Sequence, residues 1–271
     1  MDFENLFRDA IGYTRDTFIG HWVRWLIFVL LGLPFALVRF VIDPAKIITG
    51  TTVHWELIPW GTLAGLVLAG VLASFFVSGY LVRIYRGVKP APDFTGWVSL
   101  FIDGVKLDIV MFVWFLPALI LFLLLAAIAL GGFLIPGLFG GAGNTLAFLL
   151  AAVVLLIAAL VLLVIAALYV SMAAVRFART GSMTEGWSLS VISGIIRRIG
   201  WGNYIIALIL LFVAGAIFGV VVSIPAAIPY IGWVVSLVLS PLLTVFSGRY
   251  IALVYEAGEG SPATPAGASG T

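Results

Sequence analysis

The sequence predicts an all-α integral membrane protein in which six transmembrane helices form three pseudo-repeated hairpins, each preceded by a cytoplasmic interfacial amphipathic helix. Hydrophobic residues make up 63% of the chain and charged residues only 10%. No Asp, Glu, Lys, Arg or His occurs between Met111 and Val175, or between Trp201 and Gly248. Such long stretches without charge predict helices that span a bilayer. A similar pattern of residues also recurs about every 90 residues, which indicates internal repeats.

Six apolar segments are long enough to cross a bilayer, whose hydrocarbon core is about 30 Å thick. Pro34 falls inside the first segment, where it can kink a helix, and Arg39 near the end can extend toward the head groups. The fourth segment has 31 residues and would be roughly 46 Å long as a helix, so we expect it to tilt or to project. The predicted spans cover residues 22–42, 57–83, 109–135, 145–175, 203–224 and 227–253.

The basic residues predict the orientation of the chain. In this six-helix arrangement, 12 of the 14 Lys and Arg residues fall on the same side as the N-terminus, and only Arg39 and Lys46 fall opposite. Lys and Arg are enriched in the cytoplasmic loops of membrane proteins. We therefore expect a multi-pass protein of the cell membrane with both termini in the cytoplasm.

Short sequence similarities precede each predicted hairpin. An aromatic residue stands seven positions before a small one at Phe3 and Ala10, at Trp97 and Gly104, and at Trp187 and Gly194. The surrounding segments NLFRDAI, SLFIDGV and LSVISGI align without gaps. We therefore expect one transmembrane domain over residues 1–257, with repeats at about 1–87, 88–181 and 182–257. Residues 258–271 are rich in Gly, Pro and small residues, which predicts a disordered tail.

The second repeat shows the amphipathic pattern clearly. Trp97, Phe101 and Val105 recur at helical spacing on one face, and Ser99 and Asp103 lie on the other. A helix of this kind lies in the plane of the membrane at the level of the head groups. We expect such an interfacial helix over residues 95–106, and similar helices over residues 3–18 and 187–199.

Residues 79–107 carry the most distinctive motif, which reads GYLVRIYRG, then PAPDF, GW and LFIDGVK. This motif, together with residues 12–25, resembles a family of archaeal multi-pass membrane proteins catalogued as a domain of unknown function and common in methanogens and haloarchaea. The resemblance implies an archaeal membrane protein of about six helices. It implies no activity, substrate or catalytic residue.

Basic residues gather where two predicted spans reach the cytoplasm. They orient the chain, and they are also candidates for contact with anionic lipid head groups or a protein partner. Each basic residue near an anionic surface contributes about 1 kcal/mol to such binding. The candidates are Arg83, Arg86, Lys89, Arg176 and Arg179.

Tryptophan is enriched at membrane interfaces, because its ring is apolar while its N–H can donate a hydrogen bond. Four tryptophans stand at the start of a predicted span or on a predicted interfacial helix. We expect these four to act as interfacial anchors: Trp22, Trp25, Trp97 and Trp187.

The residue types that most enzymes need are scarce in this chain. There is no Cys, and the only histidines, His21 and His54, are expected on opposite sides of the membrane. No His, Cys, Asp and Glu have the spacing of metal ligands, and no span places a His or Lys beside a serine to activate it. We therefore predict no catalytic, cofactor-binding or metal site, and no enzyme activity. The net charge of only +2 gives no indication of nucleic-acid binding.

Two further patterns allow both a structural and a functional interpretation. Asp103 and Asp108 stand near the start of the third span, where they are candidates for a cation site or gate, although we favour a solvated helix face. GxxxG pairs allow close packing of helices, which we expect within the chain rather than between copies of it. These pairs are Gly61 with Gly65 and Gly215 with Gly219.

Two functions of different kinds fit these observations better than an enzyme that acts on lipids. The first is a non-enzymatic scaffold or assembly factor that organises lipids or protein partners through its interfacial helices. The second is a channel or conduit for small uncharged or lipidic solutes. Membrane lipids are the expected partners in both cases, and a protein partner or a second copy of the chain is a further candidate. A continuous polar path, a lipid-filled groove or a closed apolar core would distinguish these functions.

Overall fold

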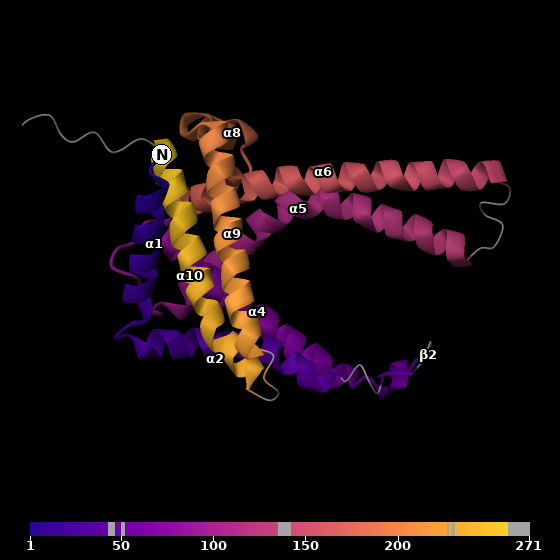
Figure 1. Ribbon diagram of the computed structural model, residues 1–271, viewed down its shortest axis with the longest axis horizontal. Helices are drawn as coiled ribbons and strands as arrows, with labels where there is room; N and C mark the ends of the chain where they lie inside the picture. Colours follow the sequence, from indigo (N-terminus) through magenta and orange to yellow (C-terminus); the bar gives the residue numbers. More distant parts are fainter. Residues whose placement is uncertain (43–46, 50–51, 135–141, 227, 229–230, 260–271) are drawn as a thin grey trace, which may run out of the picture. The chain divides into compact units, whose positions relative to one another are not determined.

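The computed structural model describes the chain except for residues 43–46, 50–51, 135–141, 227, 229–230 and 260–271 (Figure 1). Helices dominate the described residues, and the only strands among them are two short ones between α2 and α4. In chain order the elements are α1 (Phe3–Phe18), α2 (Trp22–Val41), β1 (Ile48–Thr49), β2 (Thr52–Val53), η1 (Trp55–Leu57), α4 (Trp60–Tyr85), α5 (Trp97–Leu134), α6 (Ala142–Thr180), α7 (Met183–Gly186), α8 (Leu189–Ile199), α9 (Trp201–Ala226) and α10 (Gly232–Glu259).

Six described helices are long and apolar enough to cross a membrane, which confirms the predicted multi-pass architecture. The first two and the last two of these spans agree with the predicted ranges to within a few residues at most boundaries. The third and fourth are longer than predicted. The spans are Trp22–Val41, Trp60–Tyr85, Trp97–Leu130, Leu146–Thr180, Trp201–Pro225 and Gly232–Glu259.

Helix α1 is a separate helix with one buried face, and its position at the membrane interface stays a prediction. The Asp2 side chain accepts a hydrogen bond from the Asn5 backbone N–H at 3.1 Å, which satisfies one of the free donors at the helix start. Its buried face includes Leu6, Ala10 and Phe18. The chain then turns at Gly20, whose positive φ of 81° is strained for other residues.

The prediction of a separate interfacial helix over residues 95–106 is wrong. These residues begin α5, which continues without a break from Trp97 into the membrane span. The amphipathic pattern instead reflects packing, because Leu100 and Gly104 on this part of α5 are buried against α4. The range predicted for the third interfacial helix, residues 187–199, holds a separate helix, α8, and the short α7 ends just before this range. The three predicted repeats therefore differ in their opening helices.

The described chain divides into two compact units, one formed by residues 1–108 and 194–271 and the other by residues 109–193. These boundaries differ from the predicted repeat boundaries near residues 88 and 182. Helix α10 continues to Glu259 and buries Gly258, so the predicted tail begins later than expected. The remainder of that tail, residues 260–271, lies outside the described residues.

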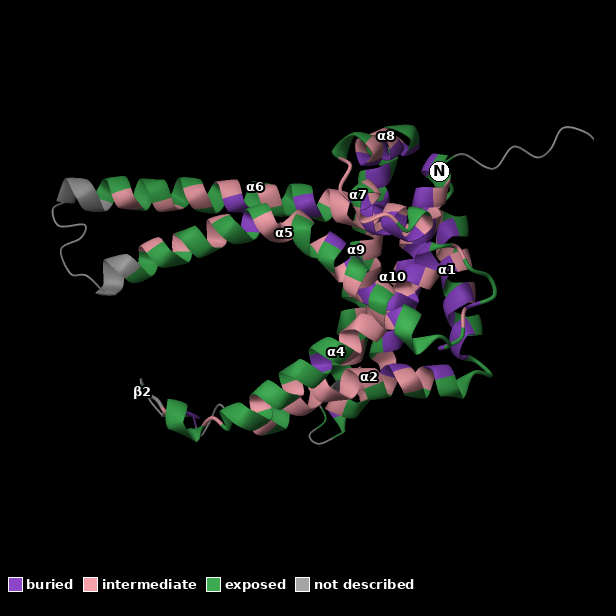
Figure 2. Cartoon of the chain, turned by 180° about the vertical axis from the view of Figure 1, so that it is seen from behind, coloured by how far each residue is buried: buried purple, intermediate pink, exposed green. Residues whose placement is uncertain are grey.

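In the first unit, α10 contacts α1, α2, α4 and α9. Figure 2 shows buried residues gathered along α1 and α10. An aromatic cluster joins α2 to α4 and to the loop after it, with the ring of Phe28 5.0 Å from that of Tyr80 and 5.1 Å from that of Phe94. This cluster and α10 form the core that supports the loop between α4 and α5.

In the second unit, the end near α7 is the part with specific polar contacts. The Trp114 ring nitrogen donates to the Gly186 carbonyl at 2.9 Å, and the Trp114 ring stacks on Tyr169 at 5.4 Å. Farther along α6 the side chains are mostly aliphatic and exposed, as the green stretch in Figure 2 shows. That exposure fits a helix whose surroundings are lipid chains.

Candidate functional site

Arg83 holds the loop between α4 and α5. Its guanidinium donates to the backbone carbonyl of Asp93 at 2.8 Å and to that of Thr95. Tyr80, one turn earlier on α4, donates to the Pro92 carbonyl at 2.9 Å. The carbonyl groups of this irregular loop are therefore satisfied by side chains of α4, which fixes the loop on the helix.

Arg86 and Lys89 form ion pairs with carboxylates on other elements. Arg86 lies 2.8 Å from Asp103 on α5, and Lys89 lies 2.8 Å from Asp9 on α1. Asp103 thus pairs with the residue that directly follows α4, so its carboxylate helps to hold the same loop. Both basic residues predicted to contact lipid here have partners within the chain, and their contact with lipid stays a prediction.

Arg176 and Arg179 lie near the end of α6. The Arg176 guanidinium donates twice to one Glu185 carboxylate oxygen, at 3.1 and 2.8 Å, which ties α6 to α7. Arg179 is half-buried one turn along the helix. These two arginines belong to the second unit, whereas Arg83, Arg86 and Lys89 belong to the first.

The four predicted tryptophan anchors differ in exposure. Trp22 is 68% exposed and stacks on Trp25, whose ring nitrogen donates to the Val238 carbonyl of α10 at 2.6 Å. Trp97 is 45% exposed and lies against Phe94. The ring nitrogen of Trp187 is buried and has no hydrogen-bond partner among the described residues. Trp22 and Trp97 are thus the most accessible of the four.

A network around Asp9 joins the two ends of the chain. Arg249 of α10, whose side chain is 2% exposed, lies 2.9 Å from Asp9 on α1 and 3.5 Å from Glu256. The Arg249 guanidinium also lies 5.5 Å from the ring centre of Tyr13. We call Asp9, Lys89, Arg249 and Glu256 the Asp9 network. The sequence offers one signal for it, because Arg249 is the first charged residue after a long charge-free stretch.

Burial and charge act in opposite directions on the carboxyl group of Asp9. Partial burial would raise its pKa, but hydrogen bonds from Arg249 and Lys89 and the charges of both lower the pKa below its ordinary value. Burial raises the pKa of the neighbouring Tyr13 to about 12, so its hydroxyl stays protonated and donates to the Val88 carbonyl at 3.1 Å. Asp9 therefore remains ionised and paired at neutral pH.

Helices α4 and α5 approach each other closely at two glycines outside the predicted GxxxG pairs. A Cβ added at Gly104 of α5 would lie 1.7 Å from the Phe75 carbonyl oxygen of α4, and one at Gly79 would lie 1.9 Å from that of Leu100. The backbones of α4 and α5 thus touch at Gly79 and Gly104. An added Cβ at any GxxxG glycine would meet no described atom within 4 Å, so the predicted packing there is wrong; those glycines are Gly61, Gly65, Gly215 and Gly219.

Asp108 differs from Asp103 in its surroundings. Its carboxylate accepts a hydrogen bond from the Ser78 hydroxyl of α4 at 2.8 Å. Other serines of the spans donate to carbonyl groups of their own helix, as the sequence predicts; examples are Ser74, Ser223, Ser236, Ser240 and Ser247. Within the described ranges, no three His, Cys, Asp or Glu residues are grouped as metal ligands would be.

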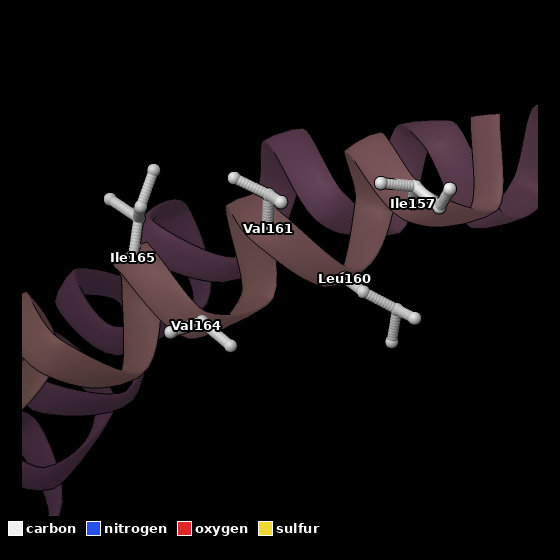
Figure 3. A pocket seen from close by; sticks show the side chains of 5 residues that line it. All are labelled: Ile157, Leu160, Val161, Val164 and Ile165. Atoms are coloured by element: carbon white, nitrogen blue, oxygen red, sulfur yellow. The ribbon is translucent and has the colours of Figure 1, made fainter. Parts of the chain in front are cut away.

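Two hollows have apolar walls. One, of about 310 Å³, is a shallow surface of α6 alone, formed by five exposed aliphatic side chains (Figure 3). The other, of about 740 Å³, lies in the first unit between α1, α9 and α10, with Trp25 of α2 at its edge. We call this second hollow the apolar groove. It was not apparent from the sequence, since its walls come from both ends of the chain.

Residues 62–227 match the model of a family described as Protein of unknown function (DUF4013). The match covers more than half of the chain, which therefore belongs to this family. The matched range includes the motif at residues 79–107, and an archaeal origin stays a prediction. No significant match was found among the curated proteins or among the solved structures.

Proposed function

We propose that this member of the DUF4013 family is a non-enzymatic membrane scaffold that organises lipids or protein partners. The observation that carries the proposal is the way Arg83, Arg86 and Lys89 hold the loop between α4 and α5 against neighbouring helices. Segments held in this way form a fixed surface, on which Trp22 and Trp97 are exposed. A fixed surface with exposed tryptophans is suited to contact with lipid head groups.

The alternative is a conduit for small uncharged or lipidic solutes. A conduit for polar solutes would use the hydroxyl groups of the spans to line a path. The hydrogen bonds of Ser74, Ser223 and Ser240 within their own helices instead satisfy those hydroxyl groups locally. These bonds favour the scaffold.

The proposed location is the cell membrane, with both termini in the cytoplasm, as the distribution of basic residues indicates. The chain has no Cys, so single cysteines report orientation without a background signal. Thr52→Cys should react with an impermeant thiol reagent in intact cells, and Thr184→Cys only in permeabilised cells. Both positions are exposed, so failure to react would reflect location rather than burial. The reverse pattern would show the opposite orientation.

The test of the scaffold uses the full chain in vesicles of phosphatidylcholine and phosphatidylglycerol. We expect enrichment of phosphatidylglycerol near the protein, and no flux of glycerol above that of protein-free vesicles. The double variant Arg86→Gln with Asp103→Asn removes a cation without leaving an unpaired carboxylate, and should reduce the enrichment while the chain stays folded. Unchanged enrichment in this variant, together with glycerol flux through the wild type, would replace the scaffold by the conduit.

A further inference from the structure

The apolar groove lies between an amphipathic helix and a pair of candidate membrane spans. Its volume of about 740 Å³ is in the range of sites that hold a small ligand. Helix α1 runs antiparallel to the second half of α10, with Phe7 against Tyr250 near one end and Phe18 near Leu242 at the other. Figure 1 shows the two helices side by side. The lining residues that matter for the occupant are Ile11, Thr14, Arg15, Ile19, Trp25 and Ile217.

The walls of the groove offer almost no hydrogen-bonding groups. Thr14 donates its hydroxyl to the Ala10 carbonyl at 2.8 Å within α1, so this group is already satisfied. Trp25 directs its ring nitrogen to the Val238 carbonyl. Arg15 is therefore the lining residue that can offer a charged group to a ligand. A ligand of the groove must be hydrocarbon along most of its length.

The groove leaves large apolar side chains uncovered on both of its sides. Ile11 of α1 and Ile19, directly after α1, are 57% and 65% exposed, and Ile217 of α9 is 60% exposed. Exposure of apolar groups on α9 is expected in a bilayer, but α1 is not one of the candidate spans. An occupant of the groove would cover the apolar groups of both helices at once.

Arg15 supplies charge complementarity at the end of α1. Its side chain is 66% exposed and lies 3.1 Å from Asp16, whose side chain is 68% exposed. An exposed pair of this kind is weak, so the guanidinium can exchange it for another anion. A guanidinium binds a phosphate group through two parallel hydrogen bonds.

We propose that the apolar groove binds one hydrocarbon chain of an anionic bilayer phospholipid, whose phosphate group pairs with Arg15. The inference rests on the proposed lipid-organising role and names the lipid class for it. The bound lipid joins α1 to the α9 and α10 hairpin by filling the space between them. Arg15 sets the preference for an anionic head group, and the apolar walls hold the chain.

The first experiment measures retained lipid by native mass spectrometry, after extraction of the full chain from vesicles of phosphatidylcholine and phosphatidylglycerol. We expect one phosphatidylglycerol retained per chain. Ile217→Trp fills the groove and should abolish this retention. The matched control is Val220→Trp, which adds the same bulk to a 65% exposed position of α9 outside the groove and should keep the lipid. Equal retention by both variants would overturn the inference.

The second experiment separates the head group from the chain. Arg15→Gln should reduce the preference for phosphatidylglycerol over phosphatidylcholine about fivefold, the factor that corresponds to about 1 kcal/mol per basic residue near anionic lipid. Arg8→Gln is the matched control, because Arg8 is an exposed, acid-paired residue of the same helix that does not line the groove. Equal loss of preference in both variants would show a general effect of charge and would overturn the role of Arg15.

A third measurement uses the wild type alone, so it does not depend on the folding of any variant. Phosphatidylglycerol with a photoactivatable group on its chain should label the lining residues of α1, α9 and α10. Labels spread evenly over the lipid-facing surface would overturn the groove as a site. A dimer that Ile217→Trp converts to a monomer would assign the groove to a second copy instead.

The scaffold and the groove can fail separately. Enrichment of phosphatidylglycerol that depends on Arg86 and Asp103 but not on Ile217 would retain the scaffold and overturn the groove. If photolabels are confined to the groove and the protein also passes glycerol, the proposal of a bound lipid stands and the scaffold proposal is overturned.

Discussion

Helices α10 and α6 are both candidate membrane spans, but they are stabilised by different surroundings. In α10, 39% of the most apolar stretch is buried within the protein, compared with 6% in α6. Helix α10 carries the buried Arg249 and contacts four other helices, whereas the ion pair of α6 with Glu185 lies at its end. The comparison shows that hydropathy identifies a span but does not tell whether lipid or protein surrounds it.

The largest expected loss of stability comes from replacing a glycine in the protein core, in contrast to replacing a glycine that faces open space. Gly104→Ala places a Cβ within 1.7 Å of the Phe75 carbonyl, so α4 and α5 must move apart. We expect a loss of more than about 4 kcal/mol in the free energy of unfolding, or failure to fold. Thermal unfolding in detergent measures the change.

The control for this prediction is Gly219→Ala on α9, where an added Cβ meets no described atom. Alanine favours a helix over glycine by about 1 kcal/mol, so this variant should be neutral or slightly more stable. Similar losses in both variants would contradict the close contact at Gly104.

The next effect concerns buried charge in α10. Arg249→Met removes a buried cation that pairs with Asp9 and Glu256, and should lower the free energy of unfolding by about 3 kcal/mol. Arg176→Met in the second unit should lower it by about 1 kcal/mol, because the Arg176 and Glu185 side chains are 27% and 39% exposed. Chemical unfolding in mixed micelles compares the two.

A double variant tests whether the loss at Arg249 comes from the Asp9 network. Asp9→Asn in the Arg249→Met background removes a carboxylate that keeps only Lys89 as its cation, so the loss in the double variant should be smaller than the sum of the two single losses. Additive losses in the double variant would show that the two residues do not interact.

A smaller effect contrasts apolar side chains in the two spans. Val245→Ala, at a fully buried position of α10, should lower the free energy of unfolding by about 1–2 kcal/mol because it leaves a cavity. Val161→Ala on α6, where the side chain is 51% exposed, should change it by less than about 0.5 kcal/mol. Equal losses would mean that α6 is covered by protein, for example by a second copy of the chain.

The smallest effect is the acid sensitivity of the Asp9 network. The pKa of Asp9 is lowered from its ordinary value of 3.8 in the folded protein. The ionised carboxylate therefore stabilises the fold above that value, and this contribution is lost as the pH falls through the lowered pKa. The melting temperature of the wild type should fall more steeply than that of Asp9→Asn below about pH 4. Asp16→Asn, at an exposed carboxylate of the same helix, should follow the wild type.

The sequence by itself determined the six candidate spans and the helical range of α1. Both are local properties, because a bilayer requires a minimum apolar length and a helix repeats its faces every 3.6 residues or so. The start of α1 is likewise local, since Asp2 and Asn5 lie within one turn. The motif at residues 79–107 covers the loop between α4 and α5. The sequence did not show that its Tyr80 and Arg83 hold this loop by hydrogen bonds to backbone carbonyls.

Only the tertiary structure decided which residues meet. Arg249 pairs with Asp9 from the opposite end of the chain, and no local pattern connects residues so far apart. Position 104 needs a glycine because the carbonyl oxygen of Phe75 on α4 leaves no room for a Cβ there. The glycines of the GxxxG pairs are the same residue type, but they have open space around them. The apolar groove also arises in this way, because α1 and α10 form its walls together. Hydrophobic length and periodicity act within one helix, but the choice of partner depends on shape and charge brought together by the fold.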